Sequence, residues 1–253
     1  FESIYTSTAV QRLIDEDAII IGRVNCDEFA MGGSNENSAY GPVLNAENVE
    51  YVPGGSSGGS AVAVQSGMCI ASLGSDTGGS IRQPASFTGT IGFKPTYGSI
   101  SRHGLIAYAS SFDQIGTFTN CIKDSVVLYN IMHGPDEFDS TCIQNKKEID
   151  VAKLNNSKQL TVGVITDYNN ASGLDPEIKK SIDSLIVKLK EDGAELKEFS
   201  FPFLEALVPT YYVITTAEAS SNLSRFDGVH YGYRSSNSNG LQDTYVKSRS
   251  EGF

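Results

Sequence analysis

Two clusters of glycine and serine enclose an apolar run in this chain, and this arrangement limits the possible folds more than any other feature. The clusters lie in the segment from Pro53 to Ala85, PGGSSGGSAVAVQSGMCIASLGSDTGGSIRQPA, and the apolar run between them extends from Ala61 to Leu73. A flexible glycine–serine linker does not carry a run of this kind. We therefore expect a closely packed helix and a buried strand in this run, with a turn at each edge that has a functional role.

The remaining sequence alternates between strand and helix patterns, which predicts the α/β class with a mixed sheet between layers of helices. With 253 residues, of which 40% are hydrophobic, the chain can bury a substantial core in one large domain or two small ones. The run at 18–24, AIIIGRV, is nearly all apolar, which is typical of a strand covered on both faces. Further strands are expected at 69–76, 160–166 and 194–201, and helices at 6–17, 57–67, 123–134, 175–193 and 209–226.

Charge and cysteine content exclude several classes of function. The formal net charge is −11, a poor electrostatic match for a phosphate backbone, so we expect any nucleic acid to be held by another chain. The four cysteines lie far apart without a CxxC pair, which argues against a structural zinc site, and we interpret Cys26 and Cys69 as buried free thiols. No apolar run has the length of a membrane span, and Phe1 does not begin a signal peptide.

Three ordinary interpretations of the glycine–serine clusters have to be weighed. The glycines could form tight turns while the serines cap the helices that follow. A phosphate-binding loop is a second possibility, but GSDTGGS lacks the lysine of that motif. The spacing Gly54-x-Ser56-x-Gly58 matches a nucleophile elbow, which would require a catalytic histidine. The three histidines lie in contexts more typical of surface or helix-capping residues: His103, His133 and His230.

A fourth interpretation uses both clusters. The stretch from Thr77 to Ser80 places successive backbone amides just before a short helical turn, where they could stabilise an oxyanion. Ser80 would then be the nucleophile. Because no histidine is in an obvious position, a hydroxyl of the other cluster could pass the proton to a buried neutral lysine, whose pKa desolvation lowers.

The segments GGSSGGS and LGSDTGGSIRQPA resemble the signature of the amidase signature family, serine hydrolases with a Ser–Ser–Lys triad, and the two serines have the family's separation of 24 positions. The resemblance implies that Ser80 forms the acyl-enzyme and that Ser56, after a cis peptide bond from Gly55, is the bridging serine. It places Thr77, Gly78 and Gly79, together with Ser80, in the oxyanion hole. The family's lysine falls upstream of Phe1, so that the 253 residues alone are expected to be inactive.

Within this family, the chain is most similar to the A subunits of tRNA-dependent amidotransferases, through DEFAMGGSNENS, GFKPTYGSISRHGLIAYASSFDQIG and YYVITTAEASSNLSRFDGVHYGY. This branch implies glutamine hydrolysis, with the ammonia passed to a B subunit that uses ATP and Mg²⁺ and contacts the tRNA. A small C subunit is a further expected partner. Met31, through its backbone, and Tyr211 would line the glutamine pocket, although core packing explains Met31 equally well.

The resemblance also sets expectations for the whole chain. It implies a single α/β/α domain over residues 1–253, incomplete at both ends, in a cytoplasmic or organellar protein. We expect no metal site and no cofactor within this chain. Two alternatives stay open: a free-standing amidase that acts on another amide, and a catalytically silent scaffold.

Overall fold

The computed structural model describes residues 3–144, 148–154, 160–169, 171 and 173–252. It separates into two compact units. The first comprises Phe1–Val151 together with Ile214–Phe253, and the second comprises Ala152–Val213. The candidate site residues from both glycine–serine clusters belong to the first unit.

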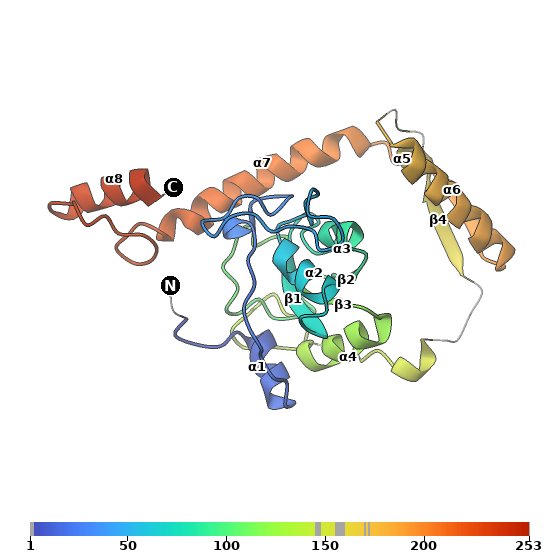
Figure 1. The fold of residues 1–253 in the computed structure, drawn as a ribbon, viewed down its shortest axis with the longest axis horizontal. Helices are drawn as coiled ribbons and strands as arrows, with labels where there is room; N and C mark the ends of the chain where they lie inside the picture. The colour runs from blue at the N-terminus through green and yellow to red at the C-terminus, as the bar shows by residue number, and fades with distance from the viewer. Residues whose placement is uncertain (1–2, 145–147, 155–159, 170, 172, 253) are drawn as a thin grey trace. The chain divides into compact units, whose positions relative to one another are not determined.

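The first unit contains a three-stranded antiparallel sheet (Figure 1). Its strands are β1 (Ala71–Asp76), β2 (Ile91–Phe93) and β3 (Gln114–Thr119), in the order β1-β3-β2. The register pairs the first residue of β1 with the last of β3, and the last residue of β1 with Gln114. β3 is buried along its whole length, which suits a strand between two neighbours with helices on both faces.

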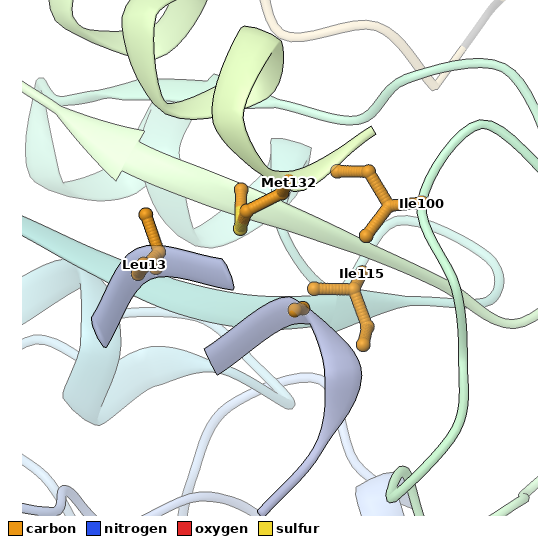
Figure 2. Packing of buried hydrophobic residues seen from close by; sticks show 5 residues of the cluster. Leu13, Ile100, Ile115 and Met132 are labelled. Carbon is orange, nitrogen blue, oxygen red and sulfur yellow. The ribbon is translucent and has the colours of Figure 1, made fainter. Parts of the chain in front are cut away.

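Helices cover the two faces of this sheet. One face packs against α1 (Thr8–Asp15) and α4 (Ile122–Met132), and the other packs against α2 (Gly58–Gln65) and α3 (Arg82–Thr88). Figure 2 shows the first contact, where Ile115 of β3 lies among Leu13, Ile100 and Met132. On the opposite face, Phe118 of β3 packs with residues of α2 and α3. The predicted α/β/α layering is therefore present in this unit.

Serine side chains form hydrogen bonds between α2 and β1, which explains why a helix in this position is rich in small polar residues. The Ser60 hydroxyl donates to the carbonyl of Leu73 at 2.7 Å, and the Ser72 hydroxyl donates to the carbonyl of Ser60 at 2.7 Å. The Ser57 hydroxyl donates to the Ser75 carbonyl at 3.2 Å. These bonds place the N-terminus of α2, and thus the first cluster, beside the end of β1, where the second cluster begins.

The second unit is built from a strand–helix–strand motif. β4 (Thr161–Ile165) and β5 (Glu195–Phe199) pair in parallel, and α5 (Thr166–Asn169) and α6 (Pro176–Glu191) connect them. Asp175 caps α6 by accepting hydrogen bonds from the backbone amides of Glu177 and Ile178. The strands expected at 160–166 and 194–201 and the helix expected at 175–193 are therefore present.

The chain then continues through α7 (Leu204–Asn222), which begins in the second unit and ends in the first, to α8 (Leu241–Gly252). Short 3-10 turns lie at Glu28–Ala30, Val151–Lys153 and Leu223–Arg225.

Two predictions about burial are wrong. The run at 18–24 forms no strand, and Ile19 and Ile21 are 86% and 68% exposed, because none of the described residues supplies a strand that pairs with this run. Cys26 is exposed and Cys69 is only partly buried, whereas Cys142 is the buried thiol. Apolar neighbours in the sequence thus did not guarantee burial. None of the helices in the described segments combines the length and hydropathy that crossing a membrane requires.

Candidate active site

The loop that carries Ser80 connects β1 to α3 and is organised by one carboxylate. Asp76, the last residue of β1, is fully buried. Its oxygens accept hydrogen bonds from the backbone amides of Gly79 at 2.9 Å, Ile81 at 3.1 Å and Arg82 at 3.3 Å. The Arg82 guanidinium adds two more, from Nε at 3.0 Å and from Nη2 at 2.9 Å. Asp76 thereby sets the path of the backbone on both sides of Ser80.

The charge of Asp76 is maintained despite its burial. Burial would raise the pKa of this carboxyl, but hydrogen bonds from Arg82 and Ile81 and the charge of Arg82 outweigh it and leave the pKa below its ordinary value. Asp76 is therefore a carboxylate at neutral pH, as its role as acceptor of five hydrogen bonds requires.

The amides of the predicted oxyanion hole differ in what they contact. The Gly79 amide donates to Asp76, so it is already engaged. The amides of Thr77, Gly78 and Ser80 donate to no acceptor within the described residues, so these three are available for an oxyanion. Three of the four predicted donor amides are therefore without an acceptor among the described residues, and the oxyanion hole itself stays a prediction.

Asp113 supports this loop from the adjacent segment. The Thr77 hydroxyl donates to Asp113 at 2.5 Å, and the backbone amides of Tyr108 and Ala109 donate to the same carboxyl at 2.9 Å and 3.0 Å. Burial raises the pKa of Asp113 above its ordinary value even though these hydrogen bonds oppose the shift. The start of the oxyanion loop is thus fixed to the turn that precedes β3.

The first cluster presents Ser56 beside the same loop. Ser56 is buried, and the Gly55–Ser56 peptide is cis, as the family resemblance predicts. The carbonyl of Ser56 accepts a hydrogen bond from the Asp27 amide at 3.0 Å, and the Ser57 amide donates to the carbonyl of Ser80 at 3.3 Å. The backbones around the two serines are therefore in direct contact. Their hydroxyls are not hydrogen-bonded to each other in the described structure, and the proton relay between them stays a prediction.

Gly55 lies where no side chain could fit. A Cβ at this position would be 2.2 Å from Oδ2 of Asp27 and 2.8 Å from the Ser34 amide nitrogen. Asp27 is itself fully buried and accepts hydrogen bonds from the amides of Asn35 at 3.0 Å and Asn37 at 3.1 Å. Sequence reasoning did not identify Asp27, because its contacts with the Ser56 loop depend on tertiary structure rather than on spacing.

The two predicted pocket residues lie in different units. Met31 follows a 3-10 turn in which Phe29 and Ala30 have positive φ values, and its side chain is 39% exposed, which is not the burial of a core residue. The carbonyl of Met31 accepts a hydrogen bond from the Asn37 side chain at 3.4 Å. Tyr211 lies on α7 in the second unit, with its ring centroid 5.4 Å from that of Tyr212. Both roles in the glutamine pocket stay predictions.

The histidine required by the elbow alternative has no counterpart near the serines in the described residues. His133 is buried and stacks on Tyr129, with a ring-centroid distance of 4.7 Å. His103 stacks on Phe138 at 4.6 Å, and His230 pairs with Asp227 at 2.9 Å. None of these rings forms a hydrogen bond with Ser56 or Ser80 in the described structure. In the same residues, no cluster of three or more histidine, cysteine or acidic side chains has the arrangement of a metal site.

Three comparisons show which known proteins this chain is similar to. The family model described as Amidase matches residues 1–253. The A subunit of glutamyl-tRNA(Gln) amidotransferase from Acidobacterium capsulatum is 52% identical over 250 residues, which is 98% of this chain and 52% of that relative. The crystal structure of the corresponding A subunit from Thermotoga maritima superposes with a TM-score of 0.84 at 38% identity, over 99% of this chain and 52% of that one.

A peptide amidase shares the fold at lower identity. The native enzyme from Stenotrophomonas maltophilia superposes with a TM-score of 0.80 at 25% identity, over 97% of this chain and 51% of that chain. The chain therefore spans about half the length of the curated relatives it matches. Together, these similarities confirm the predicted α/β amidase fold.

Proposed function

Because this chain belongs to the amidase family, we propose that the full-length protein containing it hydrolyses glutamine as the A subunit of a glutamyl-tRNA(Gln) amidotransferase. The observation that carries this proposal is the 52% identity to such a protein over 98% of the chain. The identity to a peptide amidase is only 25%, although that structure also superposes over nearly the whole chain. The similarity in sequence therefore favours the amidotransferase branch over a free-standing amidase.

In the proposed reaction, Ser80 Oγ attacks the carboxamide carbon of glutamine. The hydroxyl proton passes through Ser56 to a neutral lysine, which this mechanism places upstream of Phe1. The tetrahedral oxyanion accepts hydrogen bonds from the amides of Thr77, Gly78 and Ser80, and one such donor is typically worth about 10²–10³-fold in rate. The C–N bond then breaks, the nitrogen takes up the relayed proton, and ammonia leaves a glutamyl ester on Ser80.

Water completes the cycle by the same acid–base path. The lysine and Ser56 remove a proton from water, which attacks the ester carbonyl, and the proton returns to Ser80 Oγ as glutamate leaves. Arg82 and Asp76 form two hydrogen bonds with each other, at 3.0 and 2.9 Å, and we assign to this pair the support of the loop that carries Ser80.

The freed ammonia would serve a partner. We propose that a B subunit, with ATP and Mg²⁺, activates Glu-tRNA(Gln) and accepts the ammonia, and that a C subunit binds the protein that contains this chain. The net charge of −11 agrees with leaving the tRNA contacts mainly to the B subunit. The proposed location is the bacterial cytoplasm or an organelle, where such a complex would supply Gln-tRNA(Gln) for protein synthesis.

A substrate survey tests this proposal. The full-length protein, purified with its partners, is assayed for ammonia release from glutamine, asparagine, aryl amides and peptide amides. We expect glutamine to have the highest kcat/KM, and we expect the addition of Glu-tRNA(Gln) and ATP to raise the rate. A clear preference for aryl or peptide amides, unaffected by the tRNA, would instead assign the protein to the free-standing amidases.

A further inference from the structure

The side chain of Gln83 connects the two serine loops to a third segment. Gln83 lies in the first turn of α3, three positions after Ser80. Its backbone amide donates to the carbonyl of Gly79 at 2.8 Å, which fixes its main chain to the oxyanion loop. Its side-chain Oε1 accepts a hydrogen bond from the Gly55 amide at 2.9 Å, and its Nε2 donates to the carbonyl of Gly33 at 2.8 Å.

These contacts confine the residue just before Ser56 from two directions. On one side, the Gly55 amide is held by Gln83. On the other side, the Asp27 carboxylate lies so close to the Gly55 Cα that an added Cβ would be 2.2 Å from it. The backbone that leads into Ser56 therefore has little room to shift with respect to α3, and α3 begins directly after the Ser80 loop.

The amide group of glutamine suits this position because it has an acceptor and a donor in one plane. Glutamate would keep an acceptor for the Gly55 amide but would lose the donor to the Gly33 carbonyl. Leucine would occupy a similar volume with neither. A comparison of glutamine, glutamate and leucine at position 83 therefore distinguishes the effect of the hydrogen bond to Gly55 from that of the hydrogen bond to Gly33. Gly33 lies two residues after Met31.

We propose that Gln83 is a positioning residue that holds Ser56 at a fixed position relative to Ser80 and to the turn that follows Met31. This inference rests on the proposed function, since it matters for catalysis only if the two serines act together. Gln83 forms no hydrogen bond with the hydroxyl of Ser56 or Ser80 in the described structure. Its contribution is made through Gly55 and Gly33, and small displacements of catalytic groups by remote changes can cost about 10²-fold in rate.

The test compares variants of the full-length protein in complex with its partners. Gln83→Leu and Gln83→Glu are assayed for kcat and KM with glutamine, for the rate of fluorophosphonate labelling, and for the thermal unfolding midpoint. Gln65→Leu is the matched control. Gln65 in α2 likewise accepts from one backbone amide, that of Ala46 at 3.0 Å, and donates to one oxygen, Oδ1 of the Asn45 side chain at 2.9 Å, but it joins a loop that carries no site residue. Ser80→Ala reports the labelling that does not depend on the nucleophile.

We expect Gln83→Leu to lower both kcat and the labelling rate by about 10²-fold with little change in KM. Gln83→Glu keeps an acceptor for the Gly55 amide but turns a carboxylate oxygen toward the Gly33 carbonyl oxygen, so it should also label more slowly than the wild type. Gln65→Leu should lower the unfolding midpoint about as much as Gln83→Leu while labelling at the wild-type rate. If Gln83→Leu does not fold, slower labelling of Gln83→Glu at an unchanged midpoint supports the proposal.

Two further results overturn it, and they are distinguishable. Wild-type labelling rates in the Gln83 variants, where Ser80→Ala abolishes labelling, would refute the positioning role and leave the proposed function intact. Labelling that survives Ser80→Ala would refute the assignment of the nucleophile, and the role of Gln83 with it.

Discussion

Asp76 determines the local geometry around the proposed nucleophile. Replacing one of its carboxylate oxygens by an NH2 group should therefore lower the stability of the protein. Asp76→Asn keeps the size of the side chain but removes the charge. Its single oxygen cannot accept all the hydrogen bonds that the two carboxylate oxygens accept from Arg82 and from three backbone amides. Hydrogen bonds to a buried charged group are worth about 1.5–3 kcal/mol. We therefore expect Asp76→Asn to lower the free energy of unfolding of the full-length protein by about that amount, measured by urea denaturation at pH 7.

The pH dependence of the same variant gives an independent check. The pKa of Asp76 in the folded protein is lowered, so its stabilising contribution is present above the unfolded pKa, near 4, and is lost as the pH falls through the folded pKa. The difference between wild type and Asp76→Asn should therefore shrink as the pH is lowered from 7 to 3. The control is Asp183→Asn, whose side chain is 49% exposed and 3.8 Å from Lys179. A difference that is constant with pH, or equal to that of the control, would contradict this account of Asp76.

At the residue scale, the cis peptide before Ser56 could be predicted because the family pattern lies in local sequence, whereas the catalytic roles of Ser56 and Ser80 stay predictions. The contacts of Asp27 and Gln83 could not be predicted. Gln83 contacts residues 28 and 50 positions away, so no spacing in the sequence reveals the pairing. The engagement of the Gly79 amide by Asp76 was also outside the reach of the motif, since it depends on where the carboxylate points.

At the scale of elements, β3 is the strand on which the sheet of the first unit depends, because it pairs with both β1 and β2, and Gly116 lies in it. A Cβ there would lie 2.1 Å from the carbonyl oxygen of Phe93 in β2, which is backbone and cannot turn aside. We expect Gly116→Ala to separate β2 from β3 and to cost about 1–3 kcal/mol or more. Urea denaturation of the full-length protein measures this cost. Gly22→Ala is the control, because nothing lies within 4 Å of its added methyl group. Equal stability of the two variants would contradict the predicted steric conflict.

Elements with a strong local signal were predictable, whereas the absence of a strand at 18–24 and the presence of β2 and β3, which depend on distant partners, were not. Helix α6 begins at Pro176 after the capping Asp175 and ends at Glu191, two residues before Gly193, and β4 and β5 flank it as expected. The run at 18–24 has the composition of a buried strand, but a strand forms only where another strand pairs with it. The short strand β2 had no distinct signal, because three residues are too few to show a periodicity.

At the scale of the whole molecule, the proposed mechanism predicts that residues 1–253 by themselves hydrolyse glutamine far more slowly than the full-length protein. In this mechanism the three oxyanion amides lie within the chain, but the lysine that accepts the proton does not. Positioned acid–base catalysis is typically worth about 10²–10⁴-fold, and losing one member of a catalytic unit can cost more.

This prediction is checked by ammonia release and fluorophosphonate labelling of both proteins, each with its Ser80→Ala variant. Circular dichroism and the unfolding midpoint show whether residues 1–253 are folded in the assay. If they turn over glutamine at the rate of the full-length protein, and Ser80→Ala abolishes it, the proton acceptor lies within the chain and the assignment of the base is wrong.

In the proposed reaction, Ser80 releases ammonia from glutamine for a separate amidation reaction. Gln-tRNA(Gln) formation is measured for the full complex that carries Ser80→Ala, in the presence of ATP and Glu-tRNA(Gln), with either glutamine or ammonium chloride as nitrogen donor. We expect Ser80→Ala to lose formation from glutamine and to retain formation from ammonium at the wild-type rate. Undiminished formation from glutamine in Ser80→Ala would contradict the proposed reaction.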